Sequence, residues 1–228
     1  MVFSIEYHTS IHMGLSYTLL REWSKNEGAW RSGLDPEEST LLLSPGSMTR
    51  DLEALLGSRV EVEVSRNGFT ALDEEAGRCL GLGEGVGKKA FEREVWLIAG
   101  GKRLVYARSV IPVDTTREWV LKALEAAEPM GRILASNNVR FVKENIELGV
   151  VRCEEVAEGL GMDAATPLVA RRYILSGKDP AGTARVGGGG GGGGGGSVIR
   201  AAVTEIFGKD ILGGKLLANP CTGSRYGK

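Results

Sequence analysis

The stretch that decides the fold is FEREVWLIAGGKRLVYARSVIPV, residues 91–113. Two runs rich in β-branched and aromatic residues flank Gly100-Gly101, a dipeptide typical of a tight two-residue hairpin. The stretch therefore predicts two antiparallel strands, over residues 91–99 and 102–113. Because a hairpin fixes its own pairing locally, this unit is the natural centre of a larger antiparallel sheet.

Two charged residues fall on strand faces that are otherwise apolar. Side chains alternate across a strand, so Arg108 shares its face with Leu104, Tyr106 and Val110. By the same alternation, Glu205 shares a face with apolar neighbours only, within residues 197–207. Burying an ionised group costs several kcal/mol unless it is paired and hydrogen-bonded. The pattern predicts either a site that handles charge or a buried ion pair that only shapes the core.

The rest of the chain predicts an α+β fold, with about six antiparallel strands and helices covering one face of the sheet. Alternating or apolar runs predict further strands over residues 59–65, 139–148, 168–176 and 198–207. Helical spacing and capping residues predict helices over residues 15–30, 47–57, 116–127, 130–134 and 153–160.

The 228 residues predict a single domain spanning 1–228. The decaglycine run over residues 187–196 exceeds what a link between neighbouring strands needs, and we expect it to be a disordered loop. Residues 209–228 have no periodic pattern and are expected to form a loose tail.

Composition excludes several classes of function. A net charge of −1 predicts neither a nucleic-acid nor a membrane partner, and no apolar run approaches ~18 residues. Two histidines and three widely spaced cysteines give no metal-ligand pattern, so no metal is expected, and the cysteines fit reduced thiols in the cytoplasm. The glycine-rich residues 81–89 lack the P-loop spacing, which argues against a nucleotide site.

Three further arginines are candidate ligand-binding cations. Arg171 and Arg172 are adjacent on one predicted strand, so alternation points them to opposite faces, and one must face inward. We take Arg172 as the candidate substrate-binding residue of the pair. Arg93 lies on the same face as Phe91 and Val95 and raises the same question.

Several segments, in this order along the chain, resemble the chorismate pyruvate-lyases. Each segment is weak alone, but their order, spacing and element type are together fairly specific, and they span roughly residues 15–207. The segments are Ser47-Met48-Thr49-Arg50, Arg66-Asn67-Gly68-Phe69, Arg93-Glu94-Val95-Trp96-Leu97, Ala107-Arg108-Ser109-Val110-Ile111-Pro112, Glu128-Pro129-Met130-Gly131-Arg132, Arg171-Arg172-Tyr173 and Val203-Thr204-Glu205-Ile206-Phe207.

The resemblance implies a six-stranded antiparallel sheet with a ligand buried beneath helical flaps. It implies conversion of chorismate to 4-hydroxybenzoate and pyruvate without a cofactor, as in ubiquinone biosynthesis. It maps the arginine that binds the ring carboxylate to Arg108 and the glutamate at the far end of the ring to Glu205. Met48 would line the pocket, and the backbone near Met130 and Gly131 would complete it. We expect a monomer or small homo-oligomer with a small-molecule substrate.

The chain departs from the bacterial pattern by an insertion over residues 153–167, by the glycine run and by a C-terminal extension. The insertion also resembles a divergent lyase-like branch and the ligand-sensing domains of transcription regulators. A non-catalytic sensor domain of the same fold is therefore one alternative to a lyase. A structural domain whose buried charges only specify the core is another.

Overall fold

The computed structural model describes residues 9–10, 16–25, 30, 34–83, 86–126, 128–179 and 197–212. The glycine loop expected over residues 187–196 lies outside the described residues, as does the expected tail from residue 213 onward. At the start of that tail, Leu212 is buried in the core, so the chain is packed rather than loose there.

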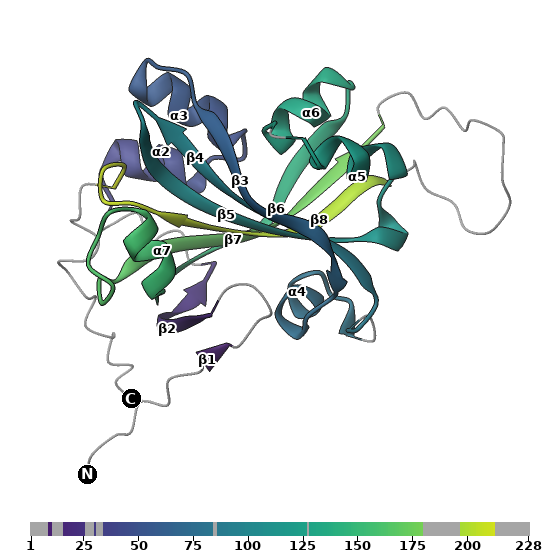
Figure 1. Cartoon of the computed structure of the whole chain (residues 1–228), viewed down its shortest axis with the longest axis horizontal. Coiled ribbons are helices and arrows are strands. Elements are labelled where there is room, and N and C mark those ends of the chain that lie inside the picture. Colours follow the sequence, from purple (N-terminus) through teal and green to yellow (C-terminus); the bar gives the residue numbers. More distant parts are fainter. Residues whose placement is uncertain are drawn as a thin grey trace, which may run out of the picture.

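The described residues form one antiparallel sheet of eight strands in the order β1-β2-β6-β7-β8-β5-β4-β3 (Figure 1). The α+β class and the antiparallel sheet are confirmed, and the six predicted strands correspond to β3 through β8. The two additional strands belong to the N-terminal segment. The bounds are β1 Thr9–Ser10, β2 Tyr17–Ser24, β3 Glu61–Ala71, β4 Lys89–Ala99, β5 Lys102–Pro112, β6 Arg140–Arg152, β7 Leu168–Lys178 and β8 Ser197–Phe207.

The helix predicted over residues 15–30 is wrong, because β2 occupies its first half. β2 pairs with β6, with Leu19 opposite Val151, and thereby satisfies backbone groups of β6 that would otherwise form an open edge. The pairing is close: a Cβ added at Gly149 would lie 2.9 Å from a ring carbon of Trp23. The pairing of β2 with β6 therefore decides the structure of this segment, although its apolar residues are spaced as in a helix.

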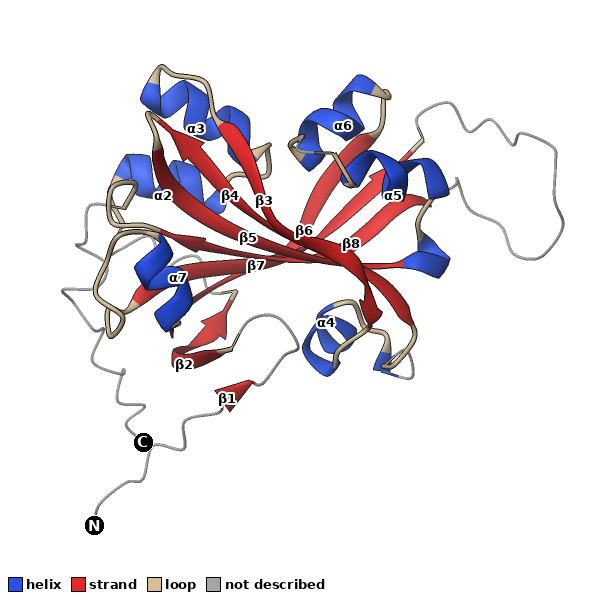
Figure 2. Cartoon of the chain, in the orientation of Figure 1, coloured by secondary structure: helices blue, strands red, loops and turns tan. Residues whose placement is uncertain are grey.

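Helices cover both faces of the sheet, which corrects the expectation of one covered face (Figures 1 and 2). Helices α2, α3, α5 and α6 pack on one side, which we call the cavity face, and α4 and α7 pack on the other. The bounds are α2 Pro36–Leu43, α3 Met48–Leu56, α4 Glu74–Cys79, the 3₁₀ turn η2 Val113–Thr115, α5 Glu118–Leu124, α6 Met130–Ser136 and α7 Glu154–Gly159.

Local sequence explains where α2 begins and where α3 ends. Asp35 and Glu38 form a reciprocal capping box at the start of α2. Gly57, with φ of 62°, ends α3 in the left-handed region that glycine adopts without strain. Ser47 stands at the N-cap position of α3 but its side chain makes no capping hydrogen bond, which leaves its hydroxyl near the cavity.

A β-bulge in the central hairpin decides which side chains of β5 face the cavity. Next to the Gly100-Gly101 turn, Ile98 pairs with Arg103, but the following pair is Leu97 with Val105, so Leu104 is an extra residue. A shift of one residue exchanges the two faces of everything that follows on the strand. As a result, Arg93 lies opposite Ser109 rather than opposite Arg108.

In the described part of the chain, no helix has the length and apolar character that crossing a membrane requires.

Candidate functional site

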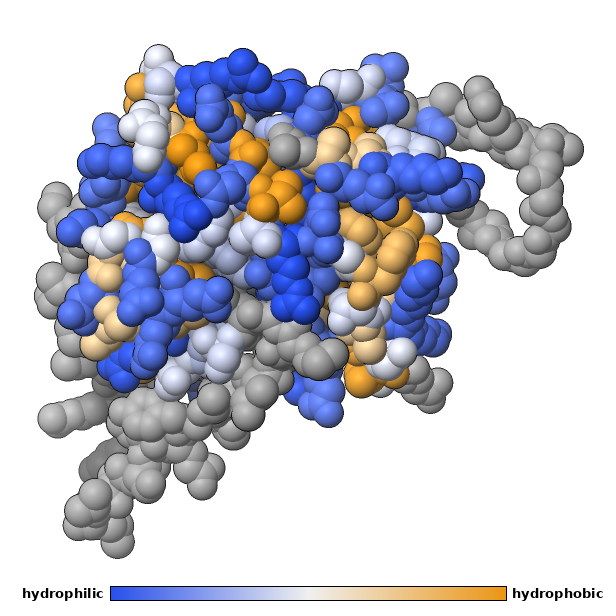
Figure 3. All heavy atoms as spheres, viewed as in Figure 1, coloured by the Kyte–Doolittle hydropathy of each residue, from blue (hydrophilic) through white to orange (hydrophobic). Residues whose placement is uncertain are grey.

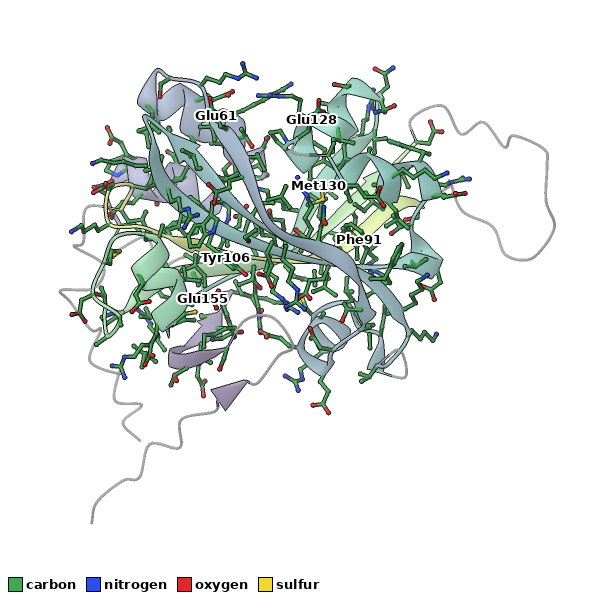
Figure 4. The ribbon with its side chains drawn as sticks, in the orientation of Figure 1. Glu61, Phe91, Tyr106, Glu128, Met130 and Glu155 are labelled. Atoms are coloured by element: carbon green, nitrogen blue, oxygen red, sulfur yellow. The ribbon has the colours of Figure 1, made fainter. Side chains whose placement is uncertain are left out.

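A cavity of about 70 Å³ lies between the cavity face of the sheet and the first turns of α3 and α6. Figure 3 shows apolar atoms exposed on this side of the molecule, between the helix pair α2–α3 and the helix pair α5–α6. In Figure 4, Met130 of α6 lies above the sheet, on the cavity side. Most of the lining is apolar, and its ionisable side chains are Arg93, Lys143, Tyr173 and Glu205.

Arg93, on β4, is a buried cation without a carboxylate partner among the described residues. Its side chain is 4% exposed, and its Nη2 donates to the backbone oxygens of Ala126 at 3.0 Å and Glu128 at 2.8 Å. Its Nε has no hydrogen-bond partner in the described structure. Burial lowers the pKa of Arg93 to about 10, so the guanidinium remains charged at neutral pH. A charge held this way, beside a cavity, is suited to an anionic ligand.

Lys143, on β6, is a second cation that no described carboxylate pairs with. Its Nζ donates to the backbone oxygen of Ser44 at 3.4 Å and lies 4.9 Å from the centre of the Tyr173 ring. Burial, followed by repulsion from Arg171, lowers the pKa of Lys143 to about 8. The group is therefore mostly protonated at pH 7, and a nearby negative charge would hold it so.

Glu205, on β8, sits in the cavity wall within a buried hydrogen-bond network. One carboxylate oxygen accepts from Arg171 Nε, and the other accepts from the Tyr173 hydroxyl at 3.1 Å. Arg171 is fully buried, and its Nη1 also donates to the last carbonyls of α2, those of Leu41 and Leu42, at 2.8 and 3.1 Å. The ion pair thus fixes the carboxylate and satisfies a helix C-terminus at the same time.

The environment keeps Glu205 ionised. Burial alone would raise the pKa of this carboxyl, but attraction to Arg171 and Lys143 and the hydrogen bonds from Arg171 and Tyr173 outweigh it, so the pKa is lowered. Conversely, burial and the neighbouring Glu205 raise the pKa of the Tyr173 hydroxyl well above its usual value. At neutral pH the wall therefore presents an acceptor carboxylate, not a carboxylic acid.

The first turns of α3 and α6 meet over part of the cavity. A Cβ added at Gly131 would lie 2.9 Å from Ser47 Oγ, so the two helices approach as closely as a glycine allows. Glu53 of α3 and Arg132 of α6 form an ion pair at 3.4 Å beside this contact. A cavity of about 70 Å³ is smaller than the ~150 Å³ cavity that accommodates benzene. A ring ligand therefore requires the lining of the cavity to rearrange.

Four of the six predicted site residues line this cavity and two do not. Met48, Met130, Gly131 and Glu205 all contribute to its wall. Arg108 and Arg172 lie on the opposite face of the sheet. The expectation that Arg108 and Glu205 face each other across one hollow is therefore wrong, because Glu205 pairs across the sheet with Ala107 and Arg108 with Thr204.

On that opposite face, Arg108 is fully committed to carboxylates. Its Nε donates to Glu92 at 2.6 Å and its Nη2 to Asp73 at 2.8 Å. Asp73 is also the N-cap of α4, where it accepts from the backbone N–H of Ala76, so Arg108 helps to hold α4 on the sheet.

Arg172 is committed in the same way. Its Nε donates to Glu147 at 2.6 Å and its Nη1 lies 3.4 Å from Glu75, which also accepts from the Tyr17 hydroxyl. The guanidinium is 4.6 Å from the Trp23 ring centre. Of the adjacent pair, it is Arg171 that faces the cavity side, and the choice of Arg172 is corrected.

Sequence reasoning missed Lys143 although the needed signal was present. Val139 and Phe141 precede Lys143 at alternate positions of one predicted strand, so the lysine follows two apolar residues on its face, before Asn145 and Glu147 continue that face. This signal resembles the one that singled out Arg108 and Glu205 but is weaker, because only one side of the lysine is apolar along the strand.

Within the described residues, no three His, Cys, Asp or Glu side chains cluster closely enough to hold a metal ion. Guanidinium and ammonium groups such as those of Arg93 and Lys143 are of the kind that pair with a carboxylate.

Comparisons with known proteins identify the family. The family model described as Chorismate pyruvate-lyase Rv2949c-like matches residues 42–181, more than half of the chain. The chain belongs to this family. The matched span includes Met48, Arg93, Met130 and Lys143, whereas Glu205 on β8 lies beyond it.

Two curated relatives agree with the family. The chain is 34% identical over 133 residues to a "Probable chorismate pyruvate-lyase" of Methylococcus capsulatus, covering 58% of this chain and 81% of that protein. It is 32% identical over 121 residues to a second protein of that description from Halorhodospira halophila, covering 50% of this chain and 63% of that protein.

Among solved structures, PhnF from Mycobacterium smegmatis shares the fold, with a TM-score of 0.55 and 17% identity over 75% of this chain and 67% of that chain. The effector domain of PhnF gives a TM-score of 0.50 with 20% identity, covering 72% of this chain and 90% of that chain. At these identities the likeness concerns the fold alone.

Proposed function

We propose that this member of the family is a chorismate pyruvate-lyase that releases pyruvate from chorismate and forms 4-hydroxybenzoate without a cofactor. The observation that carries the proposal is the buried, unpaired guanidinium of Arg93, placed in an apolar cavity whose wall also presents ionised Glu205. The family match and the two relatives support the same reaction class. The enzyme would act in the cytoplasm, and its product would supply ubiquinone biosynthesis.

In this proposal Arg93, not Arg108, binds the ring carboxylate. Arg93 lines the cavity beside Val95 and Ser109, and its Nε has no hydrogen-bond partner among the described residues. Two backbone carbonyls already hold Nη2, so the group is fixed before the ligand arrives. A ligand carboxylate would supply the missing counter-charge of Arg93. A neutral analogue of the ligand would leave the buried guanidinium without one and should therefore bind more weakly.

Glu205 contacts the far end of the ring. In the reaction, the ether C–O bond breaks, one ring hydrogen leaves as a proton, the ring becomes aromatic and the departing enolpyruvate takes up a proton to become pyruvate. Because Arg171 lowers its pKa, Glu205 is a weak base that accepts a hydrogen bond from the ring hydroxyl and orients the ring. A hydrogen bond to an ionised group of this kind contributes about 1.5–3 kcal/mol to binding.

Met48, Met130 and Gly131 complete the binding site from the two helices that close it. Entry of chorismate would separate the start of α3 from the start of α6, and their return would exclude water from the ring. Release of 4-hydroxybenzoate would require the same contact between α3 and α6 to open again.

The test is incubation of the purified chain with chorismate, while 4-hydroxybenzoate and pyruvate are measured separately. Equimolar formation of both products, lost in the Arg93→Met variant, supports the proposal. Absence of turnover, with chorismate recovered intact, contradicts it.

A ligand-binding domain without catalysis is the second candidate function, because the chain shares its fold with the effector domain of PhnF. Binding of 4-hydroxybenzoate to the same cavity, without turnover of chorismate, would favour this alternative.

A further inference from the structure

The uncompensated charge of the cavity indicates the kind of ligand that fits it. Of its ionisable lining residues, Arg93 and Lys143 are cations without a described carboxylate partner, while Glu205 is already balanced by Arg171. Closing such a cavity over a neutral molecule would bury two unpaired cations, which is costly. Closing it over one negative charge would leave one cation unpaired. A ligand with two negative charges, one beside each cation, gives both a direct partner, which Asp51 does not, because it attracts Lys143 without forming an ion pair with it in the described structure.

The two cations also occupy different walls. Arg93 comes from β4 and is held by the carbonyls of Ala126 and Glu128, in the connection between α5 and α6. Lys143 comes from β6 and reaches a carbonyl in the connection between α2 and α3. Three strands, β5, β8 and β7, separate β4 from β6 in the sheet. One carboxylate cannot take up both positions as readily as two carboxylates joined by a ring and a short arm.

We infer that Lys143 is the specificity-determining residue that binds the second, side-chain carboxylate of a dianionic ligand, while Arg93 binds the ring carboxylate. This inference rests on the proposed function, in which the substrate carries two carboxylates and the aromatic product carries one. Lys143 would therefore favour retention of substrate over retention of product. Loss of the side-chain carboxylate with pyruvate would leave Lys143 unpaired and weaken the hold on what remains.

The lysine is suited to this role by its surroundings. The charged and titratable groups that face it are Arg171 and Tyr173 on β7, Glu205 on β8 and Asp51 on α3. Arg171 repels it and Glu205 is shared with Arg171, while Asp51 attracts it but forms no ion pair with it in the described structure. The pKa of Lys143 is about 8 in the absence of ligand, so preference for a dianion should decline as the pH rises above that value.

The test uses two stable ligands of similar size and the same ring and ether. The dianion is 3-(carboxymethoxy)benzoate and the monoanion is 3-ethoxybenzoate. Calorimetric titration at pH 7 should show the dianion binding the wild-type chain about 10–100 times more tightly, as expected for one charge-assisted hydrogen bond. Lys143→Met should reduce this preference to less than about 3-fold while leaving the monoanion unaffected, and Lys143→Arg should retain it.

Raising the pH from 7 to 9.5 should reduce the wild-type preference and leave that of Lys143→Arg unchanged, because arginine stays protonated. The inference is overturned if Lys143→Met keeps the preference, if it weakens both ligands equally, or if the wild-type chain binds neither.

Turnover separates this inference from the proposed function. Chorismate turnover with an unchanged KM in Lys143→Met would overturn only the role of Lys143. A charge preference that depends on Lys143, in a chain that does not convert chorismate, would overturn only the lyase activity.

Discussion

The two faces of the central sheet treat buried charge in opposite ways. On the face covered by α4 and α7, Arg108 and Arg172 each contact two carboxylates, so both of these arginines have their partners inside the protein. On the cavity face, Arg93 and Lys143 have none among the described residues. Paired arginines attach a helix or a strand to the sheet. Unpaired cations beside a cavity make the protein dependent on a ligand for their counter-charge.

The largest effects should come from substituting one arginine on each face of the sheet, Arg108 and Arg93. Arg108→Met leaves Glu92 and Asp73 without their cation and should lower the free energy of unfolding by about 3–5 kcal/mol. Arg93→Met should change stability by less than about 1.5 kcal/mol, yet weaken binding of 4-hydroxybenzoate about 10²–10³-fold. Urea denaturation and calorimetric titration measure the two quantities.

The matched control is the double variant Arg108→Met/Glu92→Leu, which removes the charges together and should recover part of the stability. Where it folds, its affinity for 4-hydroxybenzoate should equal that of the wild-type chain. Loss of affinity in this variant, or a large loss of stability in Arg93→Met, would break the contrast between the faces.

Glu205 lies on the cavity face but forms an ion pair within the protein, with Arg171, as the arginines of the opposite face do with their carboxylates. Glu205→Gln leaves a fully buried arginine without a counter-ion and should lower stability by about 3 kcal/mol at pH 7. The pKa of Glu205 is lowered in the folded chain, so its stabilisation is complete above the unfolded value of about 4.3. It is lost as the pH falls through the lower folded pKa.

The difference in unfolding free energy between wild type and Glu205→Gln should therefore be constant from pH 5 to 7 and shrink below pH 4. Chemical denaturation at a series of pH values checks it. A difference that grows on acidification would mean that Glu205 is protonated, as a general acid, in the folded chain.

Lys143→Met should raise stability, because it removes a half-buried cation that forms no ion pair in the described structure. The folded pKa of about 8 lies below the unfolded value of about 10.4, so at pH 7 the charged form costs up to roughly 3 kcal/mol. Between pH 8 and 10 the unfolded chain binds the extra proton, and the stability of the wild type rises relative to the variant.

Thermal unfolding of both proteins at pH 7 and pH 9.5 measures this. We expect the variant to be the more stable at pH 7 and the two to converge at pH 9.5. A variant that is less stable at pH 7 would show that Lys143 has a partner in the folded chain.

The smallest effect concerns the closure over the cavity. Gly131→Ala places a methyl group 2.9 Å from Ser47 Oγ and should raise the KM for chorismate about 3–10-fold with little loss of stability. Ser47→Ala in the same chain removes the clashing oxygen and should restore much of the loss. Steady-state kinetics of the two variants test this, and an unchanged KM in Gly131→Ala would show that α3 and α6 need not meet.

The sequence predicted the hairpin, the six strands from β3 to β8 and the place of Glu205, Met48, Met130 and Gly131. These follow from local patterns: alternation, a two-glycine turn and short segments shared with a family. It did not predict that Arg108 points away from the cavity. With an unbroken hairpin, residues 93 and 108 would be opposite each other, and it is the extra residue Leu104 that separates their faces.

The N-terminal strand escaped prediction for a different reason. Leu19, Leu20 and Trp23 have a spacing that suits a helix, and only the partner strand β6, more than a hundred residues away, makes β2 a strand. Long-range pairing of this kind leaves no local mark in the sequence. The unpaired state of Arg93 is also a property of the assembled cavity, since it depends on which groups the fold brings near.

The most direct test of the contrast between the faces is a crystal structure of the chain with 4-hydroxybenzoate. We predict the ligand carboxylate within hydrogen-bond distance of Arg93 Nε and the phenol oxygen toward Glu205, with α3 and α6 closed over the ring. A ligand bound beside Arg108 on the opposite face, or a ligand in the cavity whose carboxylate avoids Arg93, would contradict the account.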